Sequence, residues 1–131
     1  MARDEQPAIF ILDDDASVRK ALTRLMRSAG MAAISFASVD ELLSAPLLPQ
    51  CACIIADIRM QGTSGLAMPG LLAARGLHSP VIFVSAQDTE ETRTAAKRAG
   101  AAGFFRKPVD DQALLDALAW AIRSDNHKNH A

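Results

Sequence analysis

Short apolar segments alternate with segments of helical periodicity along the whole chain. Five apolar runs have the length of buried strands: 9–12, 31–36, 53–56, 80–84 and 102–105. Each is followed by a helical pattern, such as Val18, Leu22 and Leu25 after the first run. Continuous apolar strands are typical of a parallel sheet that is covered on both faces. The pattern therefore predicts an α/β fold with a five-stranded parallel sheet, doubly wound as (βα)5.

Capping residues and glycines indicate where the helices begin and end. The first helix should begin after Asp15 or Ser17, whose side chains can cap it, and end before Gly30. Asp88 and Glu91 have the spacing of a capping box at the start of the fourth helix. The apolar face of that helix consists only of alanines, so we expect it to pack shallowly and to shift at low cost.

Two other helices have less certain ends. The third should extend from about 64 to 75, with a kink or a late start at Pro69 and Gly70, since neither residue favours a helix interior. The last should extend over about 110–123, where apolar residues recur along one face.

Composition fits one domain. The chain has 131 residues, half of them apolar, and we expect a single domain over 1–131 with its core at about 9–123 and a flexible polar tail at 124–131. The net charge of −1 gives no reason to expect nucleic acid as a partner. A polar N-terminus and the lack of any apolar run near ~20 residues predict a cytoplasmic protein without a membrane partner.

Four of the five predicted strands end in reactive side chains. Asp13 and Asp14 follow the first strand, Asp57 the third, Ser85 ends the fourth, and Lys107 follows the fifth. Because the carboxyl ends of parallel strands lie at one edge of a sheet, these side chains should lie together. Each has an ordinary explanation by itself, as a helix cap, a turn residue or a loop lysine. Their coincidence at one edge favours a functional site.

The chemistry of these groups points to phosphoryl transfer. Two carboxylates 4 Å apart repel each other by about 4 kcal/mol at an effective dielectric of ~20. A divalent cation with oxygen ligands removes this repulsion, and Mg²⁺ or Mn²⁺ suits such a set. Lys107 adds a positive charge and Ser85 a hydroxyl donor. With these groups around it, Asp57 could act as a nucleophile that forms an aspartyl phosphate.

The sequence resembles the receiver domain of bacterial two-component response regulators over about residues 9–122. The matching motifs are Ile11-Leu12-Asp13-Asp14-Asp15, Asp57-Ile58-Arg59-Met60, Val84-Ser85-Ala86 and Phe105-Arg106-Lys107-Pro108. Phe36-Ala37-Ser38 before Glu41-Leu42-Leu43 resembles the subgroup related to nitrogen-fixation regulators. The resemblance implies a flavodoxin-like receiver fold. It also implies a phosphoacceptor that is not an enzyme, although it assists its own phosphorylation and dephosphorylation.

The resemblance assigns a role to each residue of the site. Asp57 would be the phosphoacceptor, and Lys107 would contact the phosphoryl group. Asp14 would bind Mg²⁺ directly together with Asp57, and Asp13 would bind it through water. The backbone carbonyl of Arg59 would be a further metal ligand, which leaves the Arg59 side chain free.

The resemblance also implies a switch and its partners. Ser85 would be the switch hydroxyl, and Phe104 the switch aromatic that turns inward and changes the surface of the fourth helix, fifth strand and fifth helix. The bond between Lys107 and Pro108 would be cis. The partners would be a histidine kinase or phosphotransfer protein, a downstream output protein or an output domain, and a second copy of the chain after phosphorylation.

The loop after Met60 departs from the family, which usually has proline there. This chain has Gln61 and Gly62, which loosen the loop beside Asp57. Our hypothesis is that the metal carbonyl is less well positioned and Mg²⁺ binding is weaker.

Three alternatives remain at this point. The chain could be a pseudo-receiver that binds partners without phosphorylation, or the receiver part of a DNA-binding transcription regulator. Asp13-Asp14-Asp15 could also belong to a phosphatase resembling the haloacid dehalogenases, with Asp13 as nucleophile, but Asp57 would then have no role.

Overall fold

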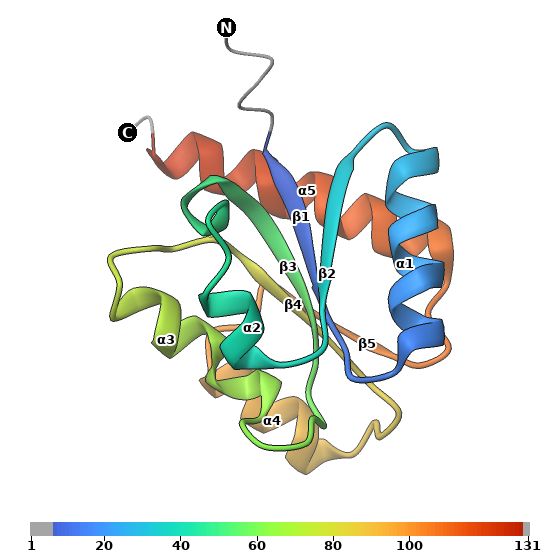
Figure 1. Ribbon diagram of the computed structural model, residues 1–131. Coiled ribbons are helices and arrows are strands. Elements are labelled where there is room, and N and C mark those ends of the chain that lie inside the picture. The colour runs from blue at the N-terminus through green and yellow to red at the C-terminus, as the bar shows by residue number, and fades with distance from the viewer. Residues whose placement is uncertain (1–6, 130–131) are drawn as a thin grey trace, which may run out of the picture.

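The computed structural model describes residues 7–129 and shows a five-stranded parallel sheet with helices on both faces (Figure 1). The strand order is β2-β1-β3-β4-β5, so the predicted doubly wound fold is confirmed. The expected end of the flexible tail, residues 130–131, lies outside the described residues. The strands are β1 (Ala8–Leu12), β2 (Ala32–Phe36), β3 (Cys51–Asp57), β4 (Val81–Ser85) and β5 (Gly103–Arg106).

The helices divide between the two faces of the sheet. One face is covered by α1 (Ala16–Ser28) and α5 (Asp111–Asn129), and the other by α2 (Val39–Leu43), α3 (Met68–Ala73) and α4 (Glu90–Arg98) (Figure 1). Two short 3₁₀ helices, η2 (Leu48–Gln50) and η3 (Gly65–Ala67), lie in the connections before β3 and α3. Among the described residues, no helix is long and apolar enough to cross a membrane.

Each face of the sheet buries its own apolar cluster. Ile11 and Ile55 pack with Leu118 of α5 on one face, and Phe10 packs in the cluster that contains Leu72 of α3 on the other. Every residue of β1 and β4 is buried, as expected for strands covered on both sides. Each of their large apolar side chains contributes roughly 1.5–3 kcal/mol to folding, so the central strands form a rigid base for the loops at their carboxyl ends.

A bulge in β3 changes the side-chain alternation near its start. Ala8 pairs with Cys51 and Ile9 with Cys53, so Ala52 has no partner in β1. Strict alternation would place the two cysteines on one face, but the bulge puts them in different clusters. Both thiols are free and buried, and burial raises the pKa of Cys51 to about 12. These cysteines are therefore protonated core residues.

Helix starts follow the predicted chemistry with one exception. The Asp15 carboxylate caps α1 by accepting a 2.8 Å hydrogen bond from the Ser17 N–H, as predicted. The capping box at Asp88 is wrong, because Thr89 caps α4 and its Oγ1 accepts from the Thr92 N–H at 3.1 Å. Asp88 is held elsewhere, in an ion pair with Arg93.

Two helix boundaries also differ from simple periodicity. Ser64 caps η3, and α3 begins only at Met68 with Pro69 in its first turn, which confirms a late start. The predicted end of the last helix near 123 is wrong, because α5 continues to Asn129. Polar residues without Gly or Pro do not stop a helix, so the composition of this segment was a poor sign of its end.

Candidate functional site

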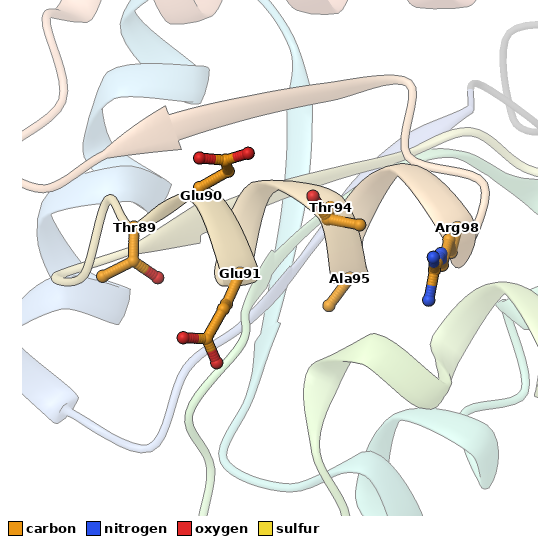
Figure 2. A pocket seen from close by; sticks show the side chains of 6 residues that line it. All are labelled: Thr89, Glu90, Glu91, Thr94, Ala95 and Arg98. Atoms are coloured by element: carbon orange, nitrogen blue, oxygen red, sulfur yellow. The ribbon is translucent and has the colours of Figure 1, made fainter.

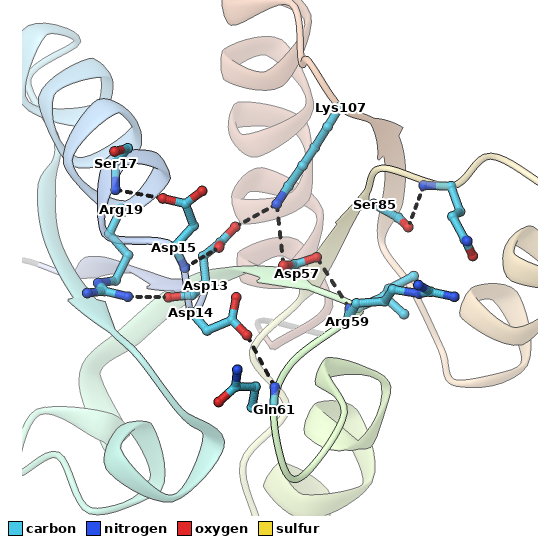
Figure 3. A network of polar contacts seen from close by, with 12 residues as sticks. Asp13, Asp14, Asp15, Ser17, Arg19, Asp57, Arg59, Gln61, Ser85 and Lys107 are labelled. Carbon is cyan, nitrogen blue, oxygen red and sulfur yellow. Dashed lines mark hydrogen bonds and ion pairs between the residues drawn. The ribbon is translucent and has the colours of Figure 1, made fainter.

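Three carboxylates meet at the carboxyl end of the sheet. Asp13 and Asp14 directly follow β1, and Asp57 is the last residue of β3, which pairs with β1. One oxygen from each carboxylate lies within 4.8 Å of the others (Figure 3). Asp13 and Asp57 are buried and Asp14 is exposed. The strand pairing thus brings together residues that are 44 positions apart in the sequence.

Lys107 reaches this cluster from the loop after β5. Its Nζ donates to Asp13 Oδ2 at 2.8 Å and lies 3.3 Å from Asp57 Oδ2 (Figure 3). The peptide bond between Lys107 and Pro108 is cis, in agreement with the resemblance. One ammonium therefore contacts both buried carboxylates.

The surroundings of Asp57 and Lys107 raise the pKa of both groups, but for different reasons. Burial and the neighbouring Asp13 raise the pKa of Asp57, and they outweigh the opposing effects of Lys107 and of the Arg59 N–H, which donates to Asp57 Oδ1 at 3.3 Å. Burial alone would lower the pKa of Lys107, but its contacts with Asp13 and Asp57 raise the pKa overall. The lysine stays charged, while ionised Asp57 is held at a cost to the fold.

This cost predicts that Asp57→Asn stabilises the metal-free protein at neutral pH. A carboxyl whose pKa is raised by folding makes the free energy of unfolding fall as pH increases through that raised pKa. Asparagine has the same shape without the charge. Urea unfolding in the presence of a chelator should show a more stable variant at pH 7, with a smaller difference at pH 4. An equal difference at both pH values would contradict this cause.

Asp13 is fixed by contacts on all sides. Its Oδ1 accepts from the Asp15 N–H at 2.9 Å, and its backbone carbonyl accepts from Arg19 Nη1 at 2.7 Å (Figure 3). Arg19 was not assigned from the sequence, because it acts on a backbone carbonyl that any residue would supply. With Lys107 on its other oxygen, each oxygen of the Asp13 carboxylate has a hydrogen-bond donor in place.

The loop after β3 packs directly against the backbone of Asp57. Ser64 Oγ donates to the Ile58 carbonyl at 2.9 Å, and the Gly65 N–H donates to the same oxygen at 3.2 Å. A Cβ at Gly65 would lie 2.0 Å from the Asp57 carbonyl oxygen. Gly65 is thus a residue of the site that the sequence did not reveal, since a glycine beside a capping serine is also common at plain helix starts.

The segment with the unusual Gln61 borders the exposed carboxylate. The Gln61 N–H donates to Asp14 Oδ2 at 3.2 Å, a contact that proline could not make (Figure 3). An open hollow lies here, lined by Asp14, Ile58, Arg59, Met60, Gln61 and Ser64. A hydrogen bond and a proline each stabilise a loop conformation by about 1 kcal/mol. The Gln61 hydrogen bond therefore opposes the weakening of Mg²⁺ binding that we expect from the more flexible loop.

Ser85 and Phe104 lie on the neighbouring strands. Asp57 pairs with Val84, so Ser85 is one position beyond it at the buried end of β4. The Ser85 hydroxyl accepts from the Gln87 N–H at 3.1 Å (Figure 3). Phe104 is half-buried in β5 and pairs with Phe83. The structure therefore places Ser85 on the strand next to β3 and Phe104 one strand further out, on β5.

The donor set fits the predicted metal. Asp13, Asp14 and Asp57 offer only carboxylate oxygens, which suit Mg²⁺ or Mn²⁺ and not the softer ions that prefer sulfur and nitrogen. Lys107 offsets part of the negative charge of these three carboxylates.

Comparison with known proteins identifies the family. The family model for the response regulator receiver domain matches residues 9–119. This chain belongs to that family. The receiver domain is 35% identical over 123 residues to nodulation protein W of Bradyrhizobium diazoefficiens, which covers 94% of this chain and 54% of the relative. It is 36% identical over 114 residues to the transcriptional regulatory protein FixJ of Azorhizobium caulinodans, covering 87% and 54%.

A solved structure agrees with the sequence relatives. The receiver domain matches a response regulator receiver protein from Burkholderia phymatum with a TM-score of 0.77 and 38% identity, covering 89% of this chain and 95% of that one. The predicted subgroup related to nitrogen-fixation regulators is confirmed. The receiver domain spans about half the length of the curated relatives it matches.

Family membership decides between two of the earlier interpretations. Receiver domains are parts of response regulators that are phosphorylated on an aspartate, and in general they serve signalling and not catalysis. A phosphatase with Asp13 as its nucleophile does not fit this family, and Asp13 is almost fully buried, with 1% of its surface accessible.

Proposed function

We propose that this receiver domain accepts a phosphoryl group on Asp57 from a phosphohistidine. The observation that carries the proposal is the position of Lys107 Nζ, in contact with both Asp13 and Asp57 inside the carboxylate cluster. An ammonium held there by Asp13 is ready to contact a group attached to Asp57.

Asp57 would act as the nucleophile. One of its oxygens attacks phosphorus, the bond from phosphorus to the histidine nitrogen breaks, and an acyl phosphate forms as the imidazole leaves. The Arg59 N–H on Oδ1 fixes the carboxylate orientation. Mg²⁺, held by Asp14, Asp57, the Arg59 carbonyl and Asp13 through water, would neutralise negative charge around the phosphoryl oxygens.

The Ser85 hydroxyl would then turn from the Gln87 N–H towards the phosphoryl group. Movement of Ser85 leaves room beside β5 for the Phe104 ring to turn inward. The surface of α4, β5 and α5 would change as a result. That surface includes the exposed Trp120 of α5, of which 67% is accessible, beside Pro80 and Ala102.

The partners follow from this chemistry. A histidine kinase or a phosphotransfer protein would supply the phosphohistidine, in the cytoplasm. An output protein would bind the altered surface, or an output domain would, since the relatives are about twice as long as the part that this chain matches. A second copy of the chain would also pair through this surface after phosphorylation. A single receiver domain over 1–131 would carry out these steps. The domain would assist its own phosphorylation and dephosphorylation without other catalysis.

The location of the phosphoryl group tests the proposal. After incubation with acetyl phosphate and Mg²⁺, peptide mapping should place a single phosphoryl group on the peptide that contains Asp57. A group found on another residue, or none at all, would favour a pseudo-receiver that acts through constitutive binding.

Lys107→Ala should separate metal binding from signalling. All three carboxylates remain, so calorimetry should show that Mg²⁺ still binds. Without the ammonium, the phosphorylated variant should fail to produce the change in partner binding that the wild type shows. Lys20→Ala, which removes an exposed lysine from α1, is the control and should behave as the wild type. Unchanged phosphorylation-dependent partner binding by Lys107→Ala would refute its role.

A further inference from the structure

An arginine covers the ring of the predicted switch aromatic. The guanidinium carbon of Arg93, in the first half of α4, lies 5.1 Å from the centre of the Phe104 ring. A cation over an aromatic face at this distance is attracted by the ring. Phe104 itself is only half-buried, and the guanidinium lies over one face of its ring.

Arg93 is in turn fixed by an acidic residue of the preceding loop. Its Nε donates to Asp88 Oδ1, and its Nη2 donates to Asp88 Oδ2 at 3.0 Å. The planar guanidinium therefore meets the carboxylate with two parallel hydrogen bonds, a geometry that lysine cannot reproduce. The Arg93 side chain is 57% exposed, so solvent weakens each contact, but together they define one orientation over the ring.

These contacts connect the two switch residues. The Ser85 hydroxyl accepts from the Gln87 N–H, Asp88 follows in the same turn, and Asp88 holds the arginine that covers Phe104. A movement of Ser85 would disturb this turn and with it the Asp88 carboxylate. The link runs through an exposed loop and a helix that buries only Ala96 completely, so it can rearrange without disrupting the core.

We infer that Arg93 is a positioning residue for Phe104, which it holds in its present half-buried orientation, and that it so opposes the inward turn of the ring. The inference rests on the proposed function, because it concerns the same switch. Removing the guanidinium should favour the inward orientation by about two- to fivefold, the factor expected for one exposed cation–ring contact. The apparent affinity of a ligand that requires the inward orientation should rise by the same factor.

The contact itself can be measured without any ligand. In protein labelled at its five phenylalanine rings, with Phe104→Leu to assign the signal, the wild type should show nuclear Overhauser contacts between the Phe104 ring and Arg93. Arg93→Ala and Asp88→Asn should shift the Phe104 signal, and Arg93→Lys should shift it less. Arg98→Ala removes an exposed arginine from the other end of α4 and should leave the Phe104 signal unchanged (Figure 2).

The functional consequence is tested with beryllofluoride, a phosphoryl analogue, at saturating Mg²⁺. Arg93→Ala should bind it about two- to fivefold more tightly than the wild type and Arg98→Ala equally well. A wild type without ring contacts to Arg93, or an Arg93→Ala variant with unchanged affinity, would overturn the inference. If the wild type showed the ring contacts but no response to beryllofluoride and no phosphoryl adduct, the proposed receiver function would fail, and the switch role of Arg93 with it.

Discussion

Asp57→Asn is expected to abolish phosphorylation of the receiver domain completely. The asparagine amide is not a nucleophile. Asp13 is less accessible than Asp57, with 1% against 6% of its surface exposed, and Asp14 is assigned as the direct metal ligand, so neither is expected to replace Asp57. The substitution keeps the size of the side chain, so β3 and its pairing with β4 should persist. Intact-mass measurement after incubation with acetyl phosphate and Mg²⁺ should show only the unmodified variant.

Asp15→Asn provides the matched control for this experiment. Asp15 is an exposed acidic residue of the loop between β1 and α1, at the same edge of the sheet as Asp57, and asparagine can cap α1 in its place. This variant should be phosphorylated like the wild type. Full labelling of Asp57→Asn would show that the acceptor is another residue.

Gly65→Ala is expected to lower both the stability and the phosphorylation rate of the domain. Its Cβ would lie 2.0 Å from the Asp57 carbonyl oxygen, and a backbone atom cannot yield as a flexible side chain can. The loop after β3 or the end of the strand must move, at a cost of about 3 kcal/mol. Because the displaced residue is Asp57, the rate of phosphorylation should fall together with the stability.

Gly70→Ala is the control for this effect. No atom lies within 4 Å of a Cβ at that position, which is inside α3. Alanine should stabilise the helix by about 0.5–1 kcal/mol and leave phosphorylation unchanged. Urea unfolding and adduct formation should be measured on both variants. Equal stability of the two variants would mean that the loop adapts without moving Asp57.

The fold and the main site were predictable because each depends on simple regularities. Continuous apolar runs alternating with helical patterns specify a covered parallel sheet, and parallel strands end at one edge. Asp13, Asp57 and Lys107 therefore had to lie close together once the strands were recognised, and the structure brings them into contact.

The remaining features depend on the paths of loops and on competition between neighbouring residues. Asp88 and Thr89 could both cap α4, and the pair formed with Arg93 decides in favour of Thr89. The close approach of Gly65 to Asp57 depends on how the loop folds back, which no periodic pattern records. The bulge at Ala52 likewise follows from the pairing of β3 with β1 and not from its own sequence.

The intact mass of the wild-type domain after incubation with acetyl phosphate tests the central claim most directly. The account predicts one phosphoryl adduct in the presence of Mg²⁺, none in the presence of a chelator, and none in Asp57→Asn. The carboxylate cluster should make the reaction depend on the cation. An adduct that formed equally with the chelator, or no adduct under any condition, would contradict the assignment of this site as a Mg²⁺-dependent phosphoacceptor.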